Sequence, residues 1–231
     1  MNQQEVGLVL CGSINPITNM HLRMFELARD YLRKNTKFRA KFGGISPTAD
    51  SYGKPDLVEA KHRQMMCKLA LESNPWVSML RWESDQPSWT PTVQVLQHYG
   101  RTEEIFKDLK LMLLCGADLL ESFTTPGLWL EKDIKNIIND FGIVVITRPD
   151  YDPHALINNS AVLQDSSSNI HLVEDWNQSG LSSTKLRRAI REGNSIRYLT
   201  PDPVIEYIDQ HGLYKTTTNN LYQELAPFRL Y

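Results

Sequence analysis

The chain has 231 residues, of which 41% are hydrophobic and 23% charged, and its 25 basic and 27 acidic side chains give a net charge of −2. A chain of this length and apolar content commonly folds as one α/β unit with a substantial core. The charge balance argues against an obligate nucleic-acid-binding protein, which would carry a basic surplus, but it is compatible with a small phosphorylated ligand at a local positive site.

The cysteines and the apolar stretches indicate where the protein is expected to work. Cys11, Cys67 and Cys115 lie in apolar or helical surroundings and are too few for a disulfide framework, so we expect buried, reduced thiols. Residues 1–5 carry no basic side chain before the first apolar run, and no stretch approaches the roughly 20 apolar residues of a spanning helix. We therefore expect an intracellular protein, cytoplasmic or nuclear, that does not bind membranes.

The first half of the chain alternates between strand and helix patterns. Residues 7–11 are continuously apolar, as in a strand buried on both faces of a parallel sheet. A helical pattern follows from about residue 18 to residue 32. The further elements expected in this half are a strand at 38–45, a helix at 57–72, a strand at 77–80 and a helix at 92–98.

The second half begins with the most apolar strand, residues 109–114, which stops before Gly116. The later elements expected are a helix at 134–141, a strand at 143–146, a helix at 154–163, a strand at 170–173, and helices at 182–191 and 203–209. This alternation predicts an α/β fold, a Rossmann-like open parallel sheet with helices on both faces. We expect a single domain over residues 1–214 and a tail over residues 215–231.

Ligands of such sheets bind beyond the carboxyl ends of the strands. The residues expected at this edge are Gly12, Ser46–Pro47, Trp82–Trp89, Gly116–Asp118, Arg148 and Asp175.

Residues 11–21 have the composition of a phosphate-binding turn. The strand ends in Gly12-Ser13, and the next helix begins near Thr18 with His21 in its first turn. Glycine lets a ligand approach the backbone, and the unpaired amides of a helix N-terminus attract phosphate. Taken alone, the segment also fits an ordinary helix cap followed by a partly exposed histidine. Its spacing matches neither Gly-x-Gly-x-x-Gly nor Gly-x-x-x-x-Gly-Lys-[Ser/Thr], which argues against a dehydrogenase or a P-loop ATPase.

A second anion site is predicted at residues 181–188. Ser182 and Ser183 stand at the expected start of a helix, and Lys185 and Arg188 follow on one face at i,i+3 spacing. In isolation, this segment also fits ordinary caps followed by a solvated basic face.

Taken together, the two segments resemble the nucleotidyltransferase superfamily, whose signatures are (His/Thr)-x-x-His and Ser-x-Thr-x-x-Arg. The resemblance is closer to the animal nicotinamide mononucleotide adenylyltransferases, and it spans about residues 7–214. The stretches that carry it are 15–23, 45–47, 114–123, 182–188 and 195–199. This chain departs from the family at Ile14, where phenylalanine is usual, and at Ser179-Gly180, where relatives have Asn-Asp.

The resemblance implies the nucleotidyltransferase fold and transfer of AMP from ATP to nicotinamide mononucleotide, and also to nicotinate mononucleotide. The mononucleotide phosphate would attack the α-phosphorus in line, giving NAD or deamido-NAD and pyrophosphate. Such transfers are catalysed mostly by positioning and by charge neutralisation, so no protein nucleophile is required. Mg²⁺ would be carried mainly by the ATP phosphates, because the sequence has no cluster of carboxylates spaced to hold a metal ion.

The resemblance also assigns residues to these roles. The expected catalytic residues are His21, Lys54 and Arg187. The expected ATP contacts are Gly12, Ser13, Ile14, His21, Thr184, Lys185, Leu186 and Arg187. The expected contacts with the mononucleotide or NAD are Ser13, Ile14, Tyr52, Lys54, Trp89, Thr92, Gly116, Asp118, Leu128, Trp129 and Asp175.

The two loop tryptophans are the most informative residues for the substrate. Trp89 and Trp129 both follow turns that contain proline, where an indole is less readily explained by core packing. A pyridine ring could lie against them, although packing at the edge of the core remains the alternative. Lys54 lies in a polar loop and, without the resemblance, fits an ordinary surface lysine.

Two alternatives stay open. One is another member of the superfamily, such as a pantetheine-phosphate or cytidylyl transferase, against which the tryptophan loops argue. The other is a protein-binding or chaperone-like module that keeps the fold without the chemistry, which the intact Gly12-Ser13, His21 and Arg187 disfavour. We also expect a homo-oligomer, and the sequence does not rank the nicotinamide substrate against the nicotinate one.

Overall fold

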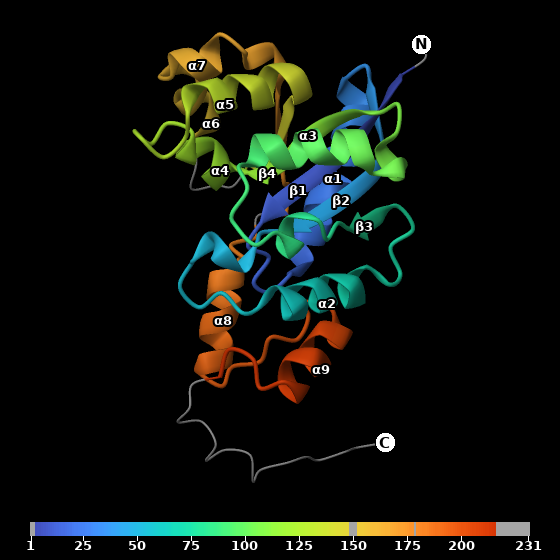
Figure 1. Ribbon diagram of the computed structural model, residues 1–231, viewed down its shortest axis with the longest axis vertical. Coiled ribbons are helices and arrows are strands. Elements are labelled where there is room, and N and C mark those ends of the chain that lie inside the picture. The colour runs from blue at the N-terminus through green and yellow to red at the C-terminus, as the bar shows by residue number, and fades with distance from the viewer. Residues whose placement is uncertain (1–2, 148–151, 178, 216–231) are drawn as a thin grey trace.

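Six parallel strands form one sheet in the order β3-β2-β1-β4-β5-β6 (Figure 1). The computed structural model describes residues 3–147, 152–177 and 179–215. The strands are β1 (Gln4–Gly12), β2 (Phe38–Pro47), β3 (Val77–Met79), β4 (Lys110–Gly116), β5 (Ile143–Thr147) and β6 (Ile170–Glu174). The direction in which strands are added to the sheet reverses at β1, which pairs with β2 on one side and with β4 on the other. A crevice therefore forms beyond the carboxyl ends of β1 and β4.

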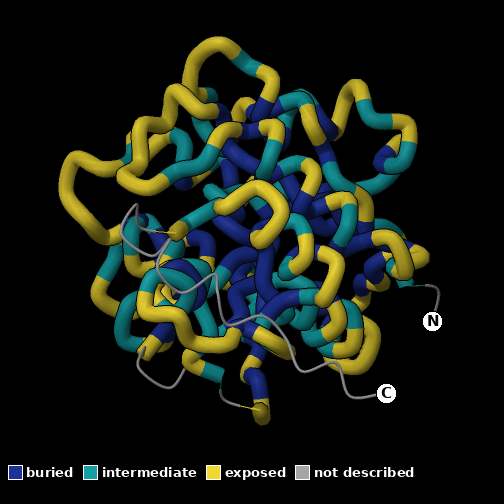
Figure 2. Tube along the Cα trace, turned by 90° about the horizontal axis from the view of Figure 1, so that it is seen from below, coloured by how far each residue is buried: buried dark blue, intermediate teal, exposed yellow. Residues whose placement is uncertain are grey.

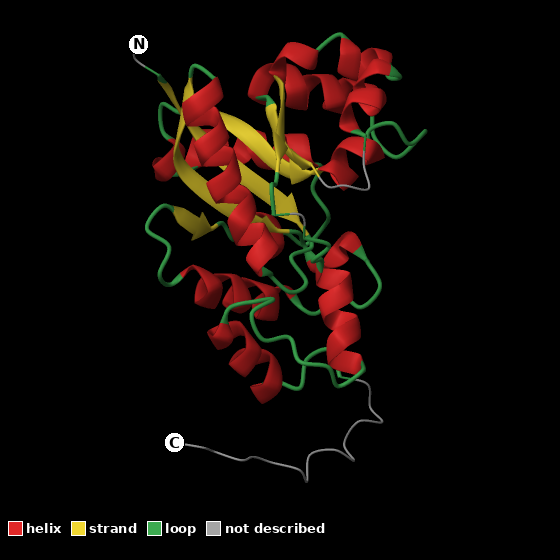
Figure 3. Cartoon of the chain, turned by 180° about the vertical axis from the view of Figure 1, so that it is seen from behind, coloured by secondary structure: helices red, strands yellow, loops and turns green. Residues whose placement is uncertain are grey.

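The described helices cover both faces of this sheet, as Figures 1 and 3 show from opposite sides. They are α1 (Asn19–Asn35), α2 (Ala60–Leu71), α3 (Thr92–Thr102), α4 (Ala117–Ser122), α5 (Glu131–Asn136), α6 (Pro153–Asn158), α7 (Ala161–Gln164), α8 (Ser183–Arg191) and α9 (Asp202–Gln210). In Figure 3 the long helix α1 lies across the sheet, and in Figure 1 α8 lies beyond the tip of β1. The Rossmann-like fold predicted from the sequence is confirmed.

The strands are buried because successive side chains enter two different apolar clusters. In β1, Leu8 and Leu10 pack with α1, α2, α8 and α9, whereas Val9 packs with the helices α3 to α7. Val144 and Val145 of β5 divide in the same way. This alternation follows from the period of two in a strand, and it explains why the central strands β1, β4 and β5 are almost continuously apolar. Figure 2 shows the resulting buried centre inside a mostly exposed outer layer.

The structure differs from the sequence expectations mainly on the side of the sheet that carries α4 to α7. The helix predicted at 154–163 is two short helices, α6 and α7, separated at Asn159 and Ser160. Asparagine and serine are residue types of low helix propensity. The helix predicted at 134–141 begins earlier, at Glu131, and Ile137–Phe141 widens into a π-helix. Helix α4, only six residues long, was not predicted.

Other sequence expectations concern the state of the cysteines, the absence of a membrane-spanning helix, and two places that the structure does not describe. Cys67 and Cys115 are buried and Cys11 is half-buried, all three as free thiols. Within the described ranges, no helix combines the length and the apolar content needed to cross a bilayer. Arg148, expected at the ligand edge, and the tail from residue 216 onward lie outside the described residues.

Candidate active site

A cavity of about 220 Å³ lies at the point where β1 and β4 end. Its walls come from these strand ends, from the first turns of α1 and α8, and from Lys54 in the loop after β2. Segments far apart in the sequence therefore meet at the crevice that the strand order predicts. The predicted site residues that line the cavity are Gly12, Ser13, Ile14, His21, Lys54, Gly116, Asp118, Thr184 and Arg187.

The start of α1 fixes the orientation of His21. Thr18 is the N-cap, and its side-chain oxygen accepts a hydrogen bond from the His21 amide at 3.4 Å. In return, the Thr18 amide donates to His21 Nδ1 at 3.0 Å. An accepting Nδ1 places the proton of the neutral imidazole on Nε2. Because Thr18 is fully buried, this reciprocal cap holds the ring rigidly at the cavity wall with a donor at Nε2.

Helix α8 is joined to the turn between β1 and α1. Ser183 Oγ donates to the Pro16 carbonyl at 2.8 Å, and Arg187 Nη1 donates to the Asn15 carbonyl at 2.8 Å. The N-termini of α1 and α8 thus border the same cavity, and each brings the positive end of a helix dipole to it.

Arg187 is only 6% exposed, and among the described residues its Nε atom has no hydrogen-bond partner. A buried guanidinium with an unpaired donor is costly, because desolvation of a polar group is normally offset by a hydrogen bond. A phosphate oxygen in the adjoining cavity is a group that could provide this bond. The arrangement is therefore suited to an anionic ligand.

The end of β4 offers a backbone surface and a carboxylate. A methyl group at Gly116 would collide with Asp118 Oδ1, so glycine at this position lets the carboxylate lie against the strand end. Asp118 is exposed and lines the cavity. A carboxylate in this place can accept hydrogen bonds from sugar hydroxyls.

The loop that carries Lys54 is exposed at its tip. Gly53 has φ +67°, a left-handed conformation that glycine adopts without strain, and Lys54 follows it into the cavity wall. The Tyr52 ring is 48% exposed and its centroid lies 6.4 Å from that of Trp89, which is 49% exposed. These two predicted contacts are neighbours, but they lie outside the lining of the cavity.

Trp129 and its neighbours form a separate group near α4. The Trp129 Nε1 donates to Ser122 Oγ at 3.0 Å, and its ring meets Phe123 edge-on at 4.9 Å between centroids. Leu128 is 61% exposed, and Thr92 is the first residue of α3. None of these three predicted contacts lines the cavity.

The remaining predicted contacts are placed differently from the cavity residues. Leu186 is fully buried in the core, so only its backbone could reach a nucleotide, and Lys185 is exposed beside the cavity. Asp175 is 4% exposed and accepts two close hydrogen bonds from Arg23, at 2.6 and 2.9 Å. Burial raises the pKa of Asp175, but the hydrogen bonds from Arg23 and from the Asn177 amide outweigh burial and leave the pKa below its ordinary value.

A buried polar cluster behind the cavity was not foreseen as such. Glu83 accepts a short hydrogen bond from Ser46 Oγ, and the Tyr99 hydroxyl lies 2.9 Å from the same oxygen. Burial raises the pKa of Glu83 to about 7, although hydrogen bonds from Ser46 and Thr48 and the charge of Arg63 act to lower it. The signal for this cluster was the sequence expectation that Ser46 and residues 82–89, which include Glu83, stand at the ligand edge.

The fold and the cavity define a nucleotide-binding α/β protein of the nucleotidyltransferase class. In agreement, the cytidylyltransferase-like family matches residues 9–189. A Plasmodium falciparum nicotinic acid mononucleotide adenylyltransferase, solved in complex with NaAD, has a similar fold, with a TM-score of 0.64 at 16% identity over 92% of this chain and 98% of that one.

Two relatives are much closer in sequence. The nicotinamide/nicotinic acid mononucleotide adenylyltransferase 1 of Bos taurus is 42% identical over 97% of this chain and 95% of its own length. The corresponding enzyme of Arabidopsis thaliana is 42% identical over 92% of this chain and 91% of its own. The chain belongs to the nicotinamide/nicotinic acid mononucleotide adenylyltransferase family, and the resemblance inferred from the sequence is confirmed.

Proposed function

We propose that this protein transfers AMP from ATP to nicotinamide mononucleotide and to nicotinate mononucleotide, forming NAD or deamido-NAD and pyrophosphate. The observation that carries the proposal is the meeting of two helix N-termini, a fixed His21 and a buried Arg187 around one cavity at the turning point of the sheet. Relatives whose names include both mononucleotides support the choice of substrates.

The proposed reaction is a direct displacement at the α-phosphorus. An oxygen of the mononucleotide phosphate forms a bond to this phosphorus, the bond to the bridging oxygen breaks, and pyrophosphate leaves with the electron pair. The protein contributes positioning and charge, because this displacement requires no protein nucleophile. His21 Nε2 would donate to the α-phosphate, while Arg187, Lys185 and the amides around Thr184 would hold the departing phosphates.

The two nucleotides would occupy opposite parts of the crevice. In this proposal, the backbone of residues 12–14 lies along the nucleotides and the Asp118 carboxylate accepts hydrogen bonds from ribose hydroxyls. Lys54 would contact a phosphate from its loop. Since Trp89 and Trp129 lie outside the cavity lining, a pyridine ring that reaches them would extend from the cavity toward these loops. Thr92 and the Leu128 backbone would then bond its carboxamide.

Mg²⁺ fits this site as a partner of the substrate. Within residues 3–147, 152–177 and 179–215, no group of three His, Cys, Asp or Glu side chains is placed to hold a metal ion. Arg187 and the helix N-termini are suited to phosphate, whereas Asp118 is the single carboxylate among the described residues that line the cavity. Mg²⁺ carried on the ATP phosphates would supply further neutralisation of their charge.

The test is to incubate the purified protein with ATP, Mg²⁺ and each mononucleotide in turn, and to separate the products by chromatography. We expect the dinucleotide and pyrophosphate in equal amounts, and none of either when Arg187 is replaced by alanine and assayed under the same conditions. A protein that is thermally stabilised by NAD but forms no dinucleotide would contradict the proposal and favour a binding module.

A further inference from the structure

Arg63 is a fully buried arginine that the reaction outlined above does not use. It lies in α2, and its side chain has no exposed surface. The guanidinium donates from Nε to the Val58 carbonyl at 2.8 Å, from Nη1 to the Ser13 carbonyl at 3.0 Å and from Nη2 to Asp50 Oδ1 at 2.8 Å. Burying a charge is expensive unless it is paired and hydrogen-bonded, so three bonds to three separate segments indicate a specific task.

Two of these segments form walls of the active site. Ser13 belongs to the turn after β1 and lines the cavity. Asp50 opens the short 3₁₀ turn Asp50–Tyr52, which leads through Gly53 to Lys54, another lining residue. The planar guanidinium of Arg63 therefore connects the turn that contains Ser13 to the loop that carries Lys54.

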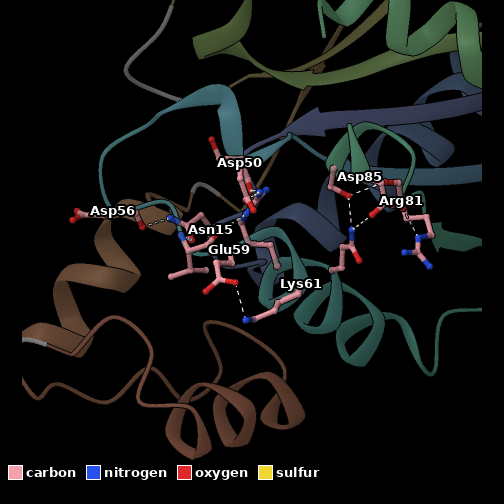
Figure 4. Close-up of polar contacts among 12 residues, drawn as sticks. Asn15, Asp50, Asp56, Glu59, Lys61, Arg81 and Asp85 are labelled. Atoms are coloured by element: carbon pink, nitrogen blue, oxygen red, sulfur yellow. Dashed lines mark hydrogen bonds and ion pairs between the residues drawn. The ribbon is translucent and has the colours of Figure 1, made fainter. Parts of the chain in front are cut away.

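The far end of this loop is held independently. The Asp56 carbonyl accepts a hydrogen bond from Asn15 Nδ2 at 2.8 Å, and the Asp56 carboxylate pairs with Arg191 at 2.8 Å. Figure 4 shows Asn15 beside Asp56, with Asp50 further along the loop. Residues 51–55 between these two attachments are all exposed. The attachments at positions 50 and 56 are thus well placed to fix where Lys54 stands.

We propose that Arg63 is a positioning residue that sets the Lys54 loop at a defined place relative to the Ser13 turn, and that it acts on Lys54 through Asp50. The inference rests on the proposed phosphate contact of Lys54. Lysine could not replace Arg63, because a single ammonium lacks the planar fork that reaches three acceptors at once. Without the hydrogen bond between Arg63 and Asp50, the loop remains attached at Asp56 but samples more conformations. Lys54 then spends less time in contact with the substrate phosphate.

Asp50→Ala is the decisive variant, because the Asp50 side chain is 55% exposed and its loss creates no cavity in the core. We expect its KM for a phosphate-bearing substrate to rise on the order of 10-fold. Its melting temperature should also fall, because the buried Arg63 loses its ion-pair partner. Arg63→Lys should show the same change, with lower stability. Glu59→Ala is the matched control, since it removes an exposed ion pair with Lys61, 2.7 Å long, at the start of the same helix (Figure 4).

The dependence on Lys54 is tested by combining variants. If Asp50 acts through Lys54, the double variant Asp50→Ala/Lys54→Ala is no worse than Lys54→Ala alone. Amide exchange over residues 51–54 should quicken in Asp50→Ala and not in Glu59→Ala. Unchanged kinetics in Asp50→Ala, or effects that multiply in the double variant, would overturn the inference while the unaltered enzyme still makes dinucleotide. Absence of dinucleotide from the unaltered protein would instead contradict the proposed function.

Discussion

At the scale of single residues, His21 is the side chain whose geometry is most restricted. Its Nδ1 accepts from the Thr18 amide, which leaves Nε2 as the donor at the cavity. We expect His21→Ala to lower kcat by about 10²–10³-fold with a smaller change in KM, because a donor that stabilises transition-state charge typically contributes this much. Steady-state kinetics with His154→Ala, an exposed histidine on α6, gives the control. Near-normal kcat in His21→Ala would assign this histidine to the helix surface.

Replacing Trp129 distinguishes a role of this residue in binding the pyridine ring from a role in packing alone. Replacing Trp129 with alanine removes apolar contact worth roughly 1.5–3 kcal/mol and an aromatic interaction of about 0.5–1.5 kcal/mol. We expect the mononucleotide KM to rise on the order of 30-fold or more with little change for ATP. Trp176→Ala is the control, because its ring is 81% exposed. Equal weakening for both substrates, or a lower melting temperature with unaltered KM, would mean that Trp129 only packs against Phe123.

At the scale of elements, the cap of α1 joins helix stability to catalysis. Thr18→Val keeps the buried volume but removes the side-chain acceptor of the capping box. We expect a loss of about 1 kcal/mol in the free energy of unfolding, because the His21 amide loses its acceptor. We also expect a lower kcat, because the Thr18 Oγ1, which lies 2.9 Å from His21 Nδ1, no longer helps the Thr18 amide to hold the ring. Denaturant unfolding and kinetics measure the two effects.

The N-cap of α6 provides the matched control for this experiment. Asp152 accepts a hydrogen bond from the Ala155 amide at 3.0 Å, on a helix packed against the opposite face of the sheet. Asp152→Ala should cost a similar stability and leave kcat unaltered. If Thr18→Val also left kcat unaltered, the cap would have no part in orienting His21.

The elements also show how far the sequence could predict the fold and the site. Continuous apolar runs predicted β1, β4 and β5, because strands buried on both faces are apolar throughout. An alternating pattern predicted β2, and short apolar stretches predicted β3 and β6. Since the carboxyl ends of parallel strands share one edge, residues 12 and 116–118 could be expected to meet. The segment at 182–187 was expected beside them only through the resemblance to the nucleotidyltransferases. Helix α4 and the break between α6 and α7 were missed because short helices depend on tertiary packing more than on a periodic pattern.

The sequence also could not predict which distant residues the buried charged side chains contact. The partners of Arg63, at Ser13 and Asp50, are separated from it by up to 50 residues. Asp175 was expected in the crevice, and its ion pair with Arg23 of α1 depends on how β6 and α1 pack together. No local pattern distinguishes these side chains from ordinary surface charges.

At the scale of the whole molecule, stability should depend on the titration of Glu83. Burial raises its pKa from the ordinary value of 4.5 to about 7, so the folded state holds a proton that the unfolded chain has released. The stabilisation is complete below pH 4.5 and is lost as pH rises to about 7, a difference on the order of 3 kcal/mol.

Glu83→Gln tests this linkage, since the amide oxygen still accepts from Ser46. We expect the unfolding free energy of the unaltered protein, minus that of Glu83→Gln, to fall between pH 4.5 and 7 in denaturant titrations. A difference that stays constant over this range would show that Glu83 is ionised throughout.

The central claim is that the cavity between β1 and β4 transfers AMP directly from ATP to the mononucleotide, without an adenylylated protein. The measurement that tests it most directly is the stereochemical course at the α-phosphorus, followed with an ATP α-thiophosphate of one configuration and the mononucleotide. A single in-line displacement predicts a dinucleotide of inverted configuration. Retention of configuration would require two displacements, and would contradict the account.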